Sequence, residues 1–346
     1  MSAYDVVVAG ASFAGLAVAQ RLGGRVLVVD PKPVGAGQTS ACGAPVALVR
    51  AVGAERSVQQ VHRHLVVHTP RAEYVWPLGE EPFCTFDYRR FCEAVWERSQ
   101  AEFRLAAVQR YQDGVVHTTA GPVRAEVVVD CTGWRAHLAR TAGLPGPRTT
   151  WFGLETEVPL RFEPGLHFYF WPEAAQDGYA WAFPCGETVR FGVLSYRGRT
   201  RLRESLDRFV ARFGLRPRGY HGGFLGVGVA GGGRGNLFVV GDGAGQCLPL
   251  TGEGIRSAVH AGWLVASLVN AGLSGRLRWE AAHETYRGYL AAQRRRLRFL
   301  EAATHLALRL PPGVLDAVLW VFSRPAVRAA FLRHYLGAFP APATPR

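Results

Sequence analysis

The stretch DVVVAGASFAG, residues 5–15, decides the fold of this chain, and a second apolar run, residues 25–30, completes the same unit. Each run has the continuous hydrophobic character of a strand buried on both faces of a parallel sheet. Gly10 permits the tight turn after the first strand, and Gly15 allows the next helix to pack closely on it. Asp30 can accept hydrogen bonds from ribose hydroxyls. The spacing therefore predicts a βαβ unit whose helix N-terminus faces a dinucleotide pyrophosphate.

This unit departs from the usual glycine pattern at Ser12, which stands where the middle glycine is expected. The serine side chain occupies space where backbone approaches phosphate, although its hydroxyl can donate a hydrogen bond to an oxygen. We expect the helix over residues 16–22. Nicotinamide and flavin nucleotides both bind such units, so other segments must decide between them. A glycine-rich turn without a ligand is the alternative.

Length and composition are those of an ordinary globular protein. The 346 residues are 48% hydrophobic and 19% charged, which predicts one large or two interleaved domains and excludes a disordered chain. The net charge is +13 and is almost entirely arginine-based, because Lys32 is the only lysine. It reflects either arginine-rich codon usage or an anionic partner such as a phospholipid surface. No RNA- or DNA-reading motif accompanies it, so we expect no nucleic-acid partner.

The cysteines and the N-terminal residues indicate the cellular compartment of the protein. Six cysteines lack CxxC pairs, which argues against a zinc site and against a disulfide-stapled secreted domain, so we expect no metal. Residues 1–12 contain no basic region followed by a cleavable apolar run. No stretch of eighteen apolar residues occurs, so no membrane span is expected. These features predict a cytoplasmic protein, with peripheral attachment to a membrane left open.

Two distant segments repeat a strand followed by a sharp glycine turn. They are AEVVVDCTGWR, residues 125–135, and LFVVGDGAG, residues 237–245; QCLPLTGEGI, residues 246–255, then leads into a helix. With these segments in this order, the chain resembles the FAD-dependent family of para-hydroxybenzoate-hydroxylase-type monooxygenases, flavin halogenases and geranylgeranyl reductases. The resemblance implies FAD and places Asp242 on its ribityl chain.

The loop after Asp242 also suits a flavin. Gly252 and Gly254 leave backbone N–H groups exposed just before a helix that begins near Ile255, and these would stabilise the negative charge of reduced flavin. The resemblance and the motifs together imply a cofactor site made of Gly10, Ser12, Phe13, Ala14, Gly15, Asp30, Pro31, Lys32, Cys42, Gly43, Arg89, Gly133, Gly241, Asp242, Pro249, Gly252, Glu253, Gly254 and Ile255.

The middle of the chain bears on the branch of this family. DGYAWAFP, residues 177–184, is followed after six residues by Phe191-Gly192, and it resembles the YxWxFP-x6-VG signature of geranylgeranyl reductases with phenylalanine in place of valine. Alternation places three aromatic side chains on one face of a strand, where they suit a long apolar substrate. Plain core packing is the alternative. We expect the substrate to contact Tyr179, Trp181, Phe183 and Pro249.

The loop VGAGQTSACG, residues 34–43, also resembles these reductases, which carry a Cys-Gly pair near the isoalloxazine. Cys42 is the matching residue. A thiol there could donate a proton, tune the flavin potential or only pack as a small hydrophobe. The candidate catalytic acids are therefore Cys42, Tyr179 or an ordered water.

Other branches differ in chemistry. Flavin halogenases have a similar WxWxIP motif but need a catalytic lysine, and the only lysine here, Lys32, lies two residues past Asp30 at the adenosine end. Halogenation is therefore not expected. Monooxygenases stay open, because no motif reports the cavity that a flavin hydroperoxide needs. No second glycine-rich βαβ unit is evident, so we expect electrons from an external donor, either NAD(P)H or a redox protein.

The last third reads as helices from residue 279 onward, with arginine-rich faces. Residues 311–313 break the pattern, and the apolar run at residues 314–322 is followed by Arg324, Arg328 and Arg333. Such a pair of apolar and basic helices suits an anionic lipid surface. A helical cap that closes the substrate cavity is the alternative, and the two can coexist.

The predicted fold class is α/β: a Rossmann-like FAD-binding domain with a mostly parallel sheet, interleaved with an antiparallel-sheet substrate domain and followed by a C-terminal helical region. The expected boundaries are 1–75, 84–150 and 233–275 for the FAD-binding domain, 76–83 and 151–232 for the substrate domain, 276–340 for the helical cap and 341–346 for a frayed tail.

The predicted function is reduction of carbon–carbon double bonds in an isoprenoid or similar long apolar substrate by hydride from flavin N5. An FAD-dependent aromatic or polyketide hydroxylase is the first alternative. A flavin-binding, redox-sensitive scaffold is the second.

Overall fold

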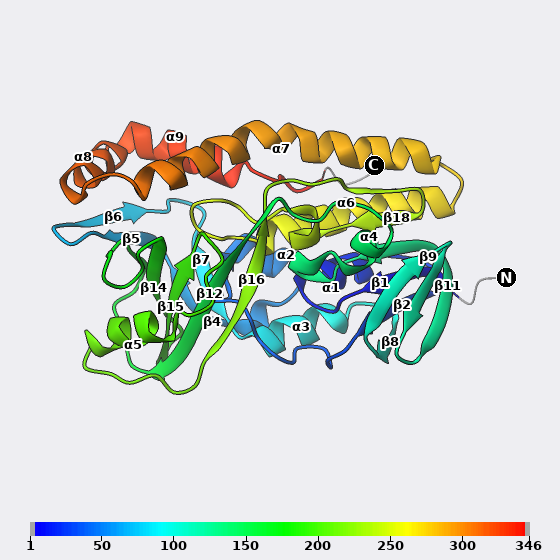
Figure 1. The fold of residues 1–346 in the computed structure, drawn as a ribbon, viewed down its shortest axis with the longest axis horizontal. Coiled ribbons are helices and arrows are strands. Elements are labelled where there is room, and N and C mark those ends of the chain that lie inside the picture. Colours follow the sequence, from blue (N-terminus) through cyan, green and yellow to red (C-terminus); the bar gives the residue numbers. More distant parts are fainter. Residues whose placement is uncertain (1–3, 343–346) are drawn as a thin grey trace.

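A computed structural model describes residues 4–342 of the chain. Within this part the strands form three sheets, and long helices cover one side of the molecule (Figure 1). The predicted α/β class is confirmed, because a mostly parallel sheet, a separate antiparallel sheet and a C-terminal helical region are all present. Residues 343–346 of the expected tail lie outside the described residues.

The largest sheet contains the βαβ unit expected from the sequence. β1 (Tyr4–Ala9) lies between β2 (Val26–Asp30) and β11 (Gly121–Asp130) and is parallel to both. Its valines are fully buried and alternate between two hydrophobic clusters, as a strand covered on both faces requires. The other strands of this sheet are β8 (Glu102–Leu105), β9 (Val108–Gln112), β10 (Val115–Thr118), β17 (Gly233–Arg234) and β18 (Leu237–Val239).

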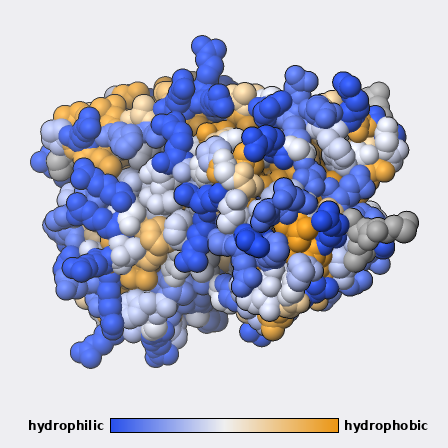
Figure 2. Space-filling view, turned by 45° about the vertical axis from the view of Figure 1, so that its right-hand side comes forward, coloured by the Kyte–Doolittle hydropathy of each residue, from blue (hydrophilic) through white to orange (hydrophobic). Residues whose placement is uncertain are grey.

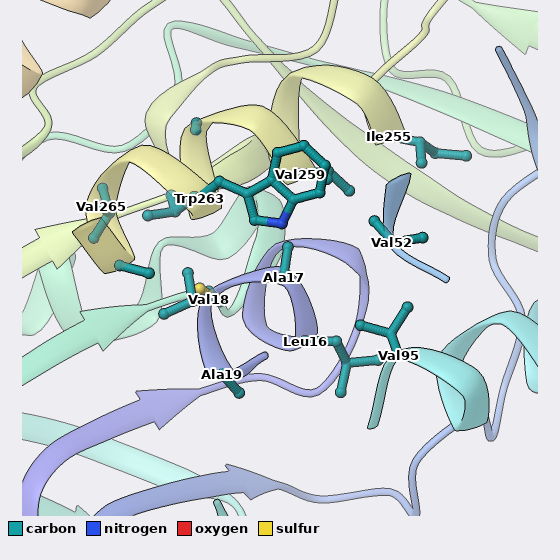
Figure 3. Packing of buried hydrophobic residues seen from close by; sticks show 14 of the residues in the cluster. Leu16, Ala17, Val18, Ala19, Val52, Val95, Ile255, Val259, Trp263 and Val265 are labelled. Atoms are coloured by element: carbon teal, nitrogen blue, oxygen red, sulfur yellow. The ribbon is translucent and has the colours of Figure 1, made fainter. Parts of the chain in front are cut away.

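Two helices pack against each other over this sheet. α1 (Phe13–Ala19) begins directly after Ser12, earlier than the expected residues 16–22, because the turn after β1 is complete by that serine. α6 (Ile255–Leu273) begins at the expected residue. A Cβ atom at Gly262 of α6 would lie only 3.2 Å from the Cβ of Ala17, so a glycine allows this close approach. Figure 3 shows Ala17 pointing toward Val259 and Trp263 of α6.

The second sheet forms the other wall of the molecule and has the strand order β16-β12-β15-β14-β13-β5-β6. All neighbours are antiparallel except β13 and β5. α5 (Arg203–Ala211) covers its outer face through a phenylalanine-rich cluster. The strands are β5 (His64–His68), β6 (Glu73–Pro77), β12 (Thr149–Pro159), β13 (Leu166–Tyr169), β14 (Gly178–Pro184), β15 (Thr188–Ser195) and β16 (His221–Val227).

The hairpin of β5 and β6 crosses into this second sheet before residue 76, where we expected the first change of domain. Its parallel pairing with β13 joins residues about a hundred positions apart, and no local pattern reports such a contact. The hairpin therefore supplies part of the wall on which the C-terminal helices rest.

A small third sheet and several short helices connect the two walls. The sheet consists of β3 (Gly43–Pro45), β4 (Val58–His62) and β7 (Phe83–Phe86). The helices beside it are α2 (Val46–Ala51), η1 (Glu55–Ser57) and α3 (Tyr88–Trp96), and the side chain of Asp87 caps α3 by accepting from the Arg90 N–H. The remaining short helices are η2 (Gly133–Arg135), α4 (His137–Thr141) and η3 (Gly241–Ala244).

The C-terminal helices are α7 (Trp279–Ala307), α8 (Pro312–Phe322) and α9 (Pro325–Leu336), and α7 runs along the top of the molecule above α6 (Figure 1). Arg256 of α6 is buried, pairs with Glu253 at 2.9 Å and donates to the carbonyl oxygens of Leu336 and Ala338. The end of the chain is thereby tied to the loop that precedes α6. Among residues 4–342, no helix combines the length and hydropathy needed to cross a membrane.

Candidate functional site

A cavity of about 630 Å³ lies between the two large sheets, and we refer to it as the central cavity. Most of the residues expected to bind the cofactor line it: Gly10, Ser12, Phe13, Ala14, Asp30, Pro31, Lys32, Cys42, Gly43, Gly133, Gly241, Asp242, Gly252, Glu253, Gly254 and Ile255. These come from segments far apart in sequence, so the tertiary fold assembles one site from the separate motifs.

Three residues of the expected site do not line the central cavity. Gly15 lies behind the turn, where a Cβ atom would be 1.8 Å from the carbonyl oxygen of Gly10. Arg89 is exposed on α3 beside Gly35, and Pro249 is buried in the loop before α6. Gly15 therefore acts by allowing close packing, whereas Arg89 and Pro249 have no lining role in this structure.

One end of the cavity is built by the βαβ unit. Gly10 has φ +110°, and a Cβ atom there would lie 2.3 Å from the carbonyl oxygen of Cys131. The carboxylate of Asp30 accepts hydrogen bonds from the backbone N–H groups of Ala11 and Lys32, both at 2.8 Å. These bonds hold the acid at the edge of the cavity, where a ribose would meet it.

Ser12 is supported by a contact that the sequence pattern does not show. The hydroxyl of Tyr88 donates to Ser12 Oγ at 3.1 Å. Because the serine oxygen is the acceptor, its own proton is free for a ligand oxygen. The replacement of the middle glycine by serine is thus compatible with an anion at this point of the cavity.

The loop around Asp242 lines another part of the cavity. Asp242 Oδ2 accepts a hydrogen bond from the Gly226 N–H at 3.1 Å, and burial raises the pKa of this carboxyl to about 6. Gly241 and Gly252 have φ values of +75° and +68°, which side chains rarely adopt. A Cβ atom at Gly254 would lie 3.3 Å from Asp242 Oδ1. The loop therefore presents backbone and the Asp242 carboxyl to the cavity.

An aromatic wall forms the second sheet's side of the cavity. Tyr179, Trp181 and Phe183 share one face of β14, as strand alternation predicts, and all three line the cavity. Leu65, Phe83, Leu166, Phe168 and Leu194 extend this apolar surface. Such a wall suits an extended hydrocarbon chain.

The hydroxyl groups at the top of this wall are engaged with protein. Tyr179 donates to the carbonyl oxygen of Thr251, and the hydroxyls of Thr251 and Tyr335 are hydrogen-bonded to each other. Burial raises the pKa of both tyrosines far above the ordinary value. Tyr335 comes from α9 and lines the cavity, a position that the sequence patterns did not indicate.

Cys42 also lines the cavity, in a left-handed backbone conformation with φ +54°. Its thiol is fully buried and donates to the carbonyl oxygen of Ser40 at 3.3 Å. Burial raises the pKa of this thiol well above its ordinary value, so the sulfur is neutral at physiological pH. The position fits a packed, unreactive thiol next to the ligand.

A buried carboxyl on the aromatic side was not anticipated. Glu155 of β12 is 3% exposed and lines the cavity. It accepts a hydrogen bond from Trp181 Nε1 at 2.9 Å, and its other oxygen is hydrogen-bonded to His221 Nε2 at 2.7 Å. The sequence gives little signal for this residue, because β12 also carries Glu157 and several threonines, and the partner His221 is known only once β12 and β16 are paired.

These residues fit a flavin dinucleotide. The glycine turn and Asp30 suit the adenosine end, Asp242 and the glycines before α6 suit the polar middle and ring edge, and the aromatic wall leaves an apolar space beside them. Gly10 and Gly254 line the cavity without a side chain, which allows a ligand to approach the backbone there.

No family model matches the chain. The chain is 27% identical over 325 residues to a digeranylgeranylglycerophospholipid reductase from Methanoculleus marisnigri, with 77% of this chain and 76% of that protein covered. It is 26% identical over 307 residues to the protein of the same name from Methanococcus vannielii, with 79% and 78% covered.

Solved structures resemble the whole chain. A geranylgeranyl bacteriochlorophyll reductase-like protein from Thermoplasma acidophilum has a TM-score of 0.84 at 19% identity, with 96% of each chain covered. A flavin-dependent brominase has a TM-score of 0.75 at 16% identity, with 96% of this chain and 92% of that chain covered. An anhydrotetracycline hydroxylase from Streptomyces rimosus has a TM-score of 0.72 at 20% identity, with 99% and 78% covered. The chain therefore has the Rossmann-like fold that a reductase-like protein, a halogenase and a hydroxylase share.

Proposed function

We propose that this protein is an FAD-dependent reductase that saturates carbon–carbon double bonds of an isoprenoid or similar long apolar substrate. The observation that carries the proposal is the central cavity, which joins a dinucleotide cradle to a continuous wall of aromatic and aliphatic side chains. The similarity to two proteins named as digeranylgeranylglycerophospholipid reductases supports an isoprenoid lipid as substrate.

Bound FAD would supply the hydride in its reduced form. The chain's own residues would then hold the reactants in place: Asp30 and Asp242 bind the cofactor, and Tyr179, Trp181 and Phe183 orient the hydrocarbon and exclude water. The only lysine, Lys32, donates to the Gly37 carbonyl oxygen at 3.3 Å beside Asp30, which does not suit a halogenase. Electrons would come from NAD(P)H or a redox protein.

Anaerobic reoxidation tests this function. The FAD-loaded protein is photoreduced without oxygen and mixed with geranylgeranyl lipids, and we expect the oxidised flavin spectrum to return together with a product two hydrogens heavier. A hydroxylase on the same fold would need oxygen and would show a C4a-hydroperoxide absorbance. A strict requirement for oxygen would replace the reductase by that alternative, and inertness in both assays would favour a redox-sensitive scaffold.

The Asp242→Asn variant should separate cofactor binding from stability. Loss of the charged acceptor is expected to weaken FAD binding about tenfold or more, because hydrogen bonds to charged groups are the stronger ones. The folded-state pKa of Asp242, about 6, lies above the ordinary value of 3.8, so the buried charge destabilises the folded apoprotein at neutral pH.

We therefore expect the Asp242→Asn apoprotein to be more stable than the wild type above about pH 6, with the difference vanishing as the pH falls toward 3.8. Flavin fluorescence titration measures the affinity, and urea unfolding at several pH values measures the stability. Equal FAD affinity in both proteins would remove Asp242 from the cofactor site.

We also propose that α8 and α9 rest on an anionic membrane surface, from which the lipid enters. The inner side of α8 is fixed to the β5–β6 hairpin: Thr69 donates to Asp316 Oδ1 at 2.6 Å, and Trp76 Nε1 donates to Ser323 Oγ at 2.9 Å. Val314, Trp320 and Val321 of the same helix are exposed. Figure 2 shows hydrophobic atoms at its upper left, the corner that α8 occupies in Figure 1.

The charges around this apolar side suit acidic headgroups. The guanidinium carbon of Arg324 lies 4.0 Å from the centre of the Trp320 ring. Arg309, just before α8, and Arg333 of α9 are also exposed. Leu308 and Leu336 pack against the aromatic cluster of the central cavity. The C-terminal region thus contacts the cavity wall through Leu336 of α9 and the end of α7, whereas α8 carries the exposed apolar residues, so the expected cap and the expected lipid surface are compatible.

Trp320→Ser is expected to weaken binding to vesicles of anionic phospholipid at least about tenfold, because burial of a large apolar side chain contributes roughly 1.5–3 kcal/mol and about 1.4 kcal/mol corresponds to a factor of ten. Leu105→Ser is the matched control: Leu105 is 58% exposed, comparable to Trp320 at 56%, but it is the last residue of β8, at the other end of the molecule. Sedimentation with vesicles measures both. Equal binding of the two variants would contradict the proposed surface.

A further inference from the structure

The strongest unassigned feature of the central cavity is the pair formed by Glu155 and His221. The two residues are directly opposite each other in the register of β12 and β16. Glu155 Oε1 and His221 Nε2 are 2.7 Å apart, a distance at which one proton is shared between the groups. Trp181 Nε1 holds the second carboxyl oxygen, so the acid is fixed against the aromatic wall.

The pair also connects the cavity with solvent. The Glu155 side chain is 3% exposed and faces the cavity, whereas the His221 side chain is 30% exposed. β16 is the edge strand of its sheet, so the imidazole lies at the border between the sheet and water. A proton taken up by the histidine can therefore reach the carboxyl without passing through the apolar space of the cavity.

The two acids expected from the sequence are less suited to donate. The Cys42 thiol proton is directed to the Ser40 carbonyl oxygen, and the Tyr179 hydroxyl proton to the Thr251 carbonyl oxygen. Donation by either would break a buried hydrogen bond and leave an anion in a site with little water. Glu155 differs because His221 can restore its proton directly.

We propose that Glu155 is the catalytic acid of this site and that His221 relays protons to it from solvent. The inference rests on the proposed reductase function. One alkene carbon accepts the hydride that reduced FAD provides, and the other takes the proton of the Glu155 carboxyl, so the π bond is replaced by two C–H bonds. Two electrons leave the flavin, which becomes oxidised. His221 then passes a proton to the Glu155 carboxylate and takes another from water.

Glu155→Gln tests this role with little change of shape. The glutamine oxygen can still accept from Trp181, and its amide can donate to the other tautomer of His221. We expect the single-turnover rate of alkene reduction to fall at least about a hundredfold, the usual size of a general-acid contribution. The dissociation constant of the alkene, measured by flavin absorbance, should stay within about threefold of the wild type.

Stereochemistry in D₂O gives a readout that a purely structural role would not change. The wild type is expected to deliver deuterium to one face of the alkene only, and the residual product of Glu155→Gln to carry it on both faces. His221→Gln should slow repeated turnover but keep the single-face delivery, because the acid itself remains. Glu187→Gln is the control: it makes the same change in an exposed surface ion pair with Arg161, outside the cavity, and should keep both rate and stereochemistry.

A further readout does not depend on turnover. The proton shared between Glu155 Oε1 and His221 Nε2 is expected to give a downfield NMR signal in the resting protein, which disappears in His221→Gln and moves in Glu155→Gln. The relay alone would be overturned if Glu155→Gln kept a rate within threefold of the wild type, or if Glu187→Gln lost as much activity as Glu155→Gln. A wild type whose reduced flavin no alkene reoxidises would overturn the proposed function, and the relay with it.

Discussion

Gly15→Ala is expected to cost about 3 kcal/mol of stability and to abolish FAD binding. An alanine Cβ would lie 1.8 Å from the carbonyl oxygen and 2.9 Å from the carbonyl carbon of Gly10. Both neighbours are backbone atoms of the turn between β1 and α1, so no flexible side chain can move aside. The variant relieves the overlap only by shifting α1 away from β1, and such overpacking costs at least a few kcal/mol. The same shift moves the turn that lines the nucleotide end of the cavity.

Gly288→Ala is the matched control, because it makes the same change in the exposed middle of α7, where a Cβ atom would meet nothing within 4 Å. Helix propensity predicts a gain of about 1 kcal/mol there. Urea unfolding measures both stabilities, and the flavin-to-protein absorbance ratio after gel filtration measures FAD retention. A Gly15→Ala protein that keeps its flavin and unfolds like the wild type would contradict the packing argument.

Arg190→Met should destabilise the protein by about 3–5 kcal/mol, because it leaves the half-buried Glu157 carboxylate and several backbone and side-chain acceptors without their partner. The Arg190 side chain is 2% exposed and pairs with Glu157 at 2.9 Å. Its guanidinium also donates to the carbonyl oxygens of Ala41 and Phe86 and to Gln59 Oε1. One side chain of β15 thus fixes the loop that carries Cys42.

Arg161→Met is the control for loss of an ion pair at the surface. Arg161 and Glu187 are 2.7 Å apart, but their side chains are 81% and 75% exposed, so we expect a change below about 1 kcal/mol. Thermal unfolding at low and high salt compares the two variants. Equal losses in both would show that burial does not decide the contribution of Arg190. We also expect weaker FAD binding in Arg190→Met alone, since the loop at Cys42 borders the cavity.

Several features were predicted from the sequence because they depend on neighbouring residues. The apolar run before Gly10 predicted the strand β1, and the apolar run that ends on Asp30 predicted β2. The glycines before Ile255 predicted the start of α6. The aromatic residues of β14 share a face because side chains alternate along any strand. Turn chemistry and periodicity are local properties, and local properties can be read from a single chain.

The tertiary structure alone decided which distant residues meet. Glu155 pairs with His221 only because β12 and β16 are neighbours in one particular register, and Tyr335 reaches the cavity only because Arg256 ties the chain end to α6. The stretch at residues 5–15 therefore determines that a dinucleotide-type βαβ unit forms, whereas sheet order and helix packing determine which acid stands opposite it. The physical reason is that strand register and long-range packing are set by the sum of many contacts across the core, and no single segment of the sequence contains them.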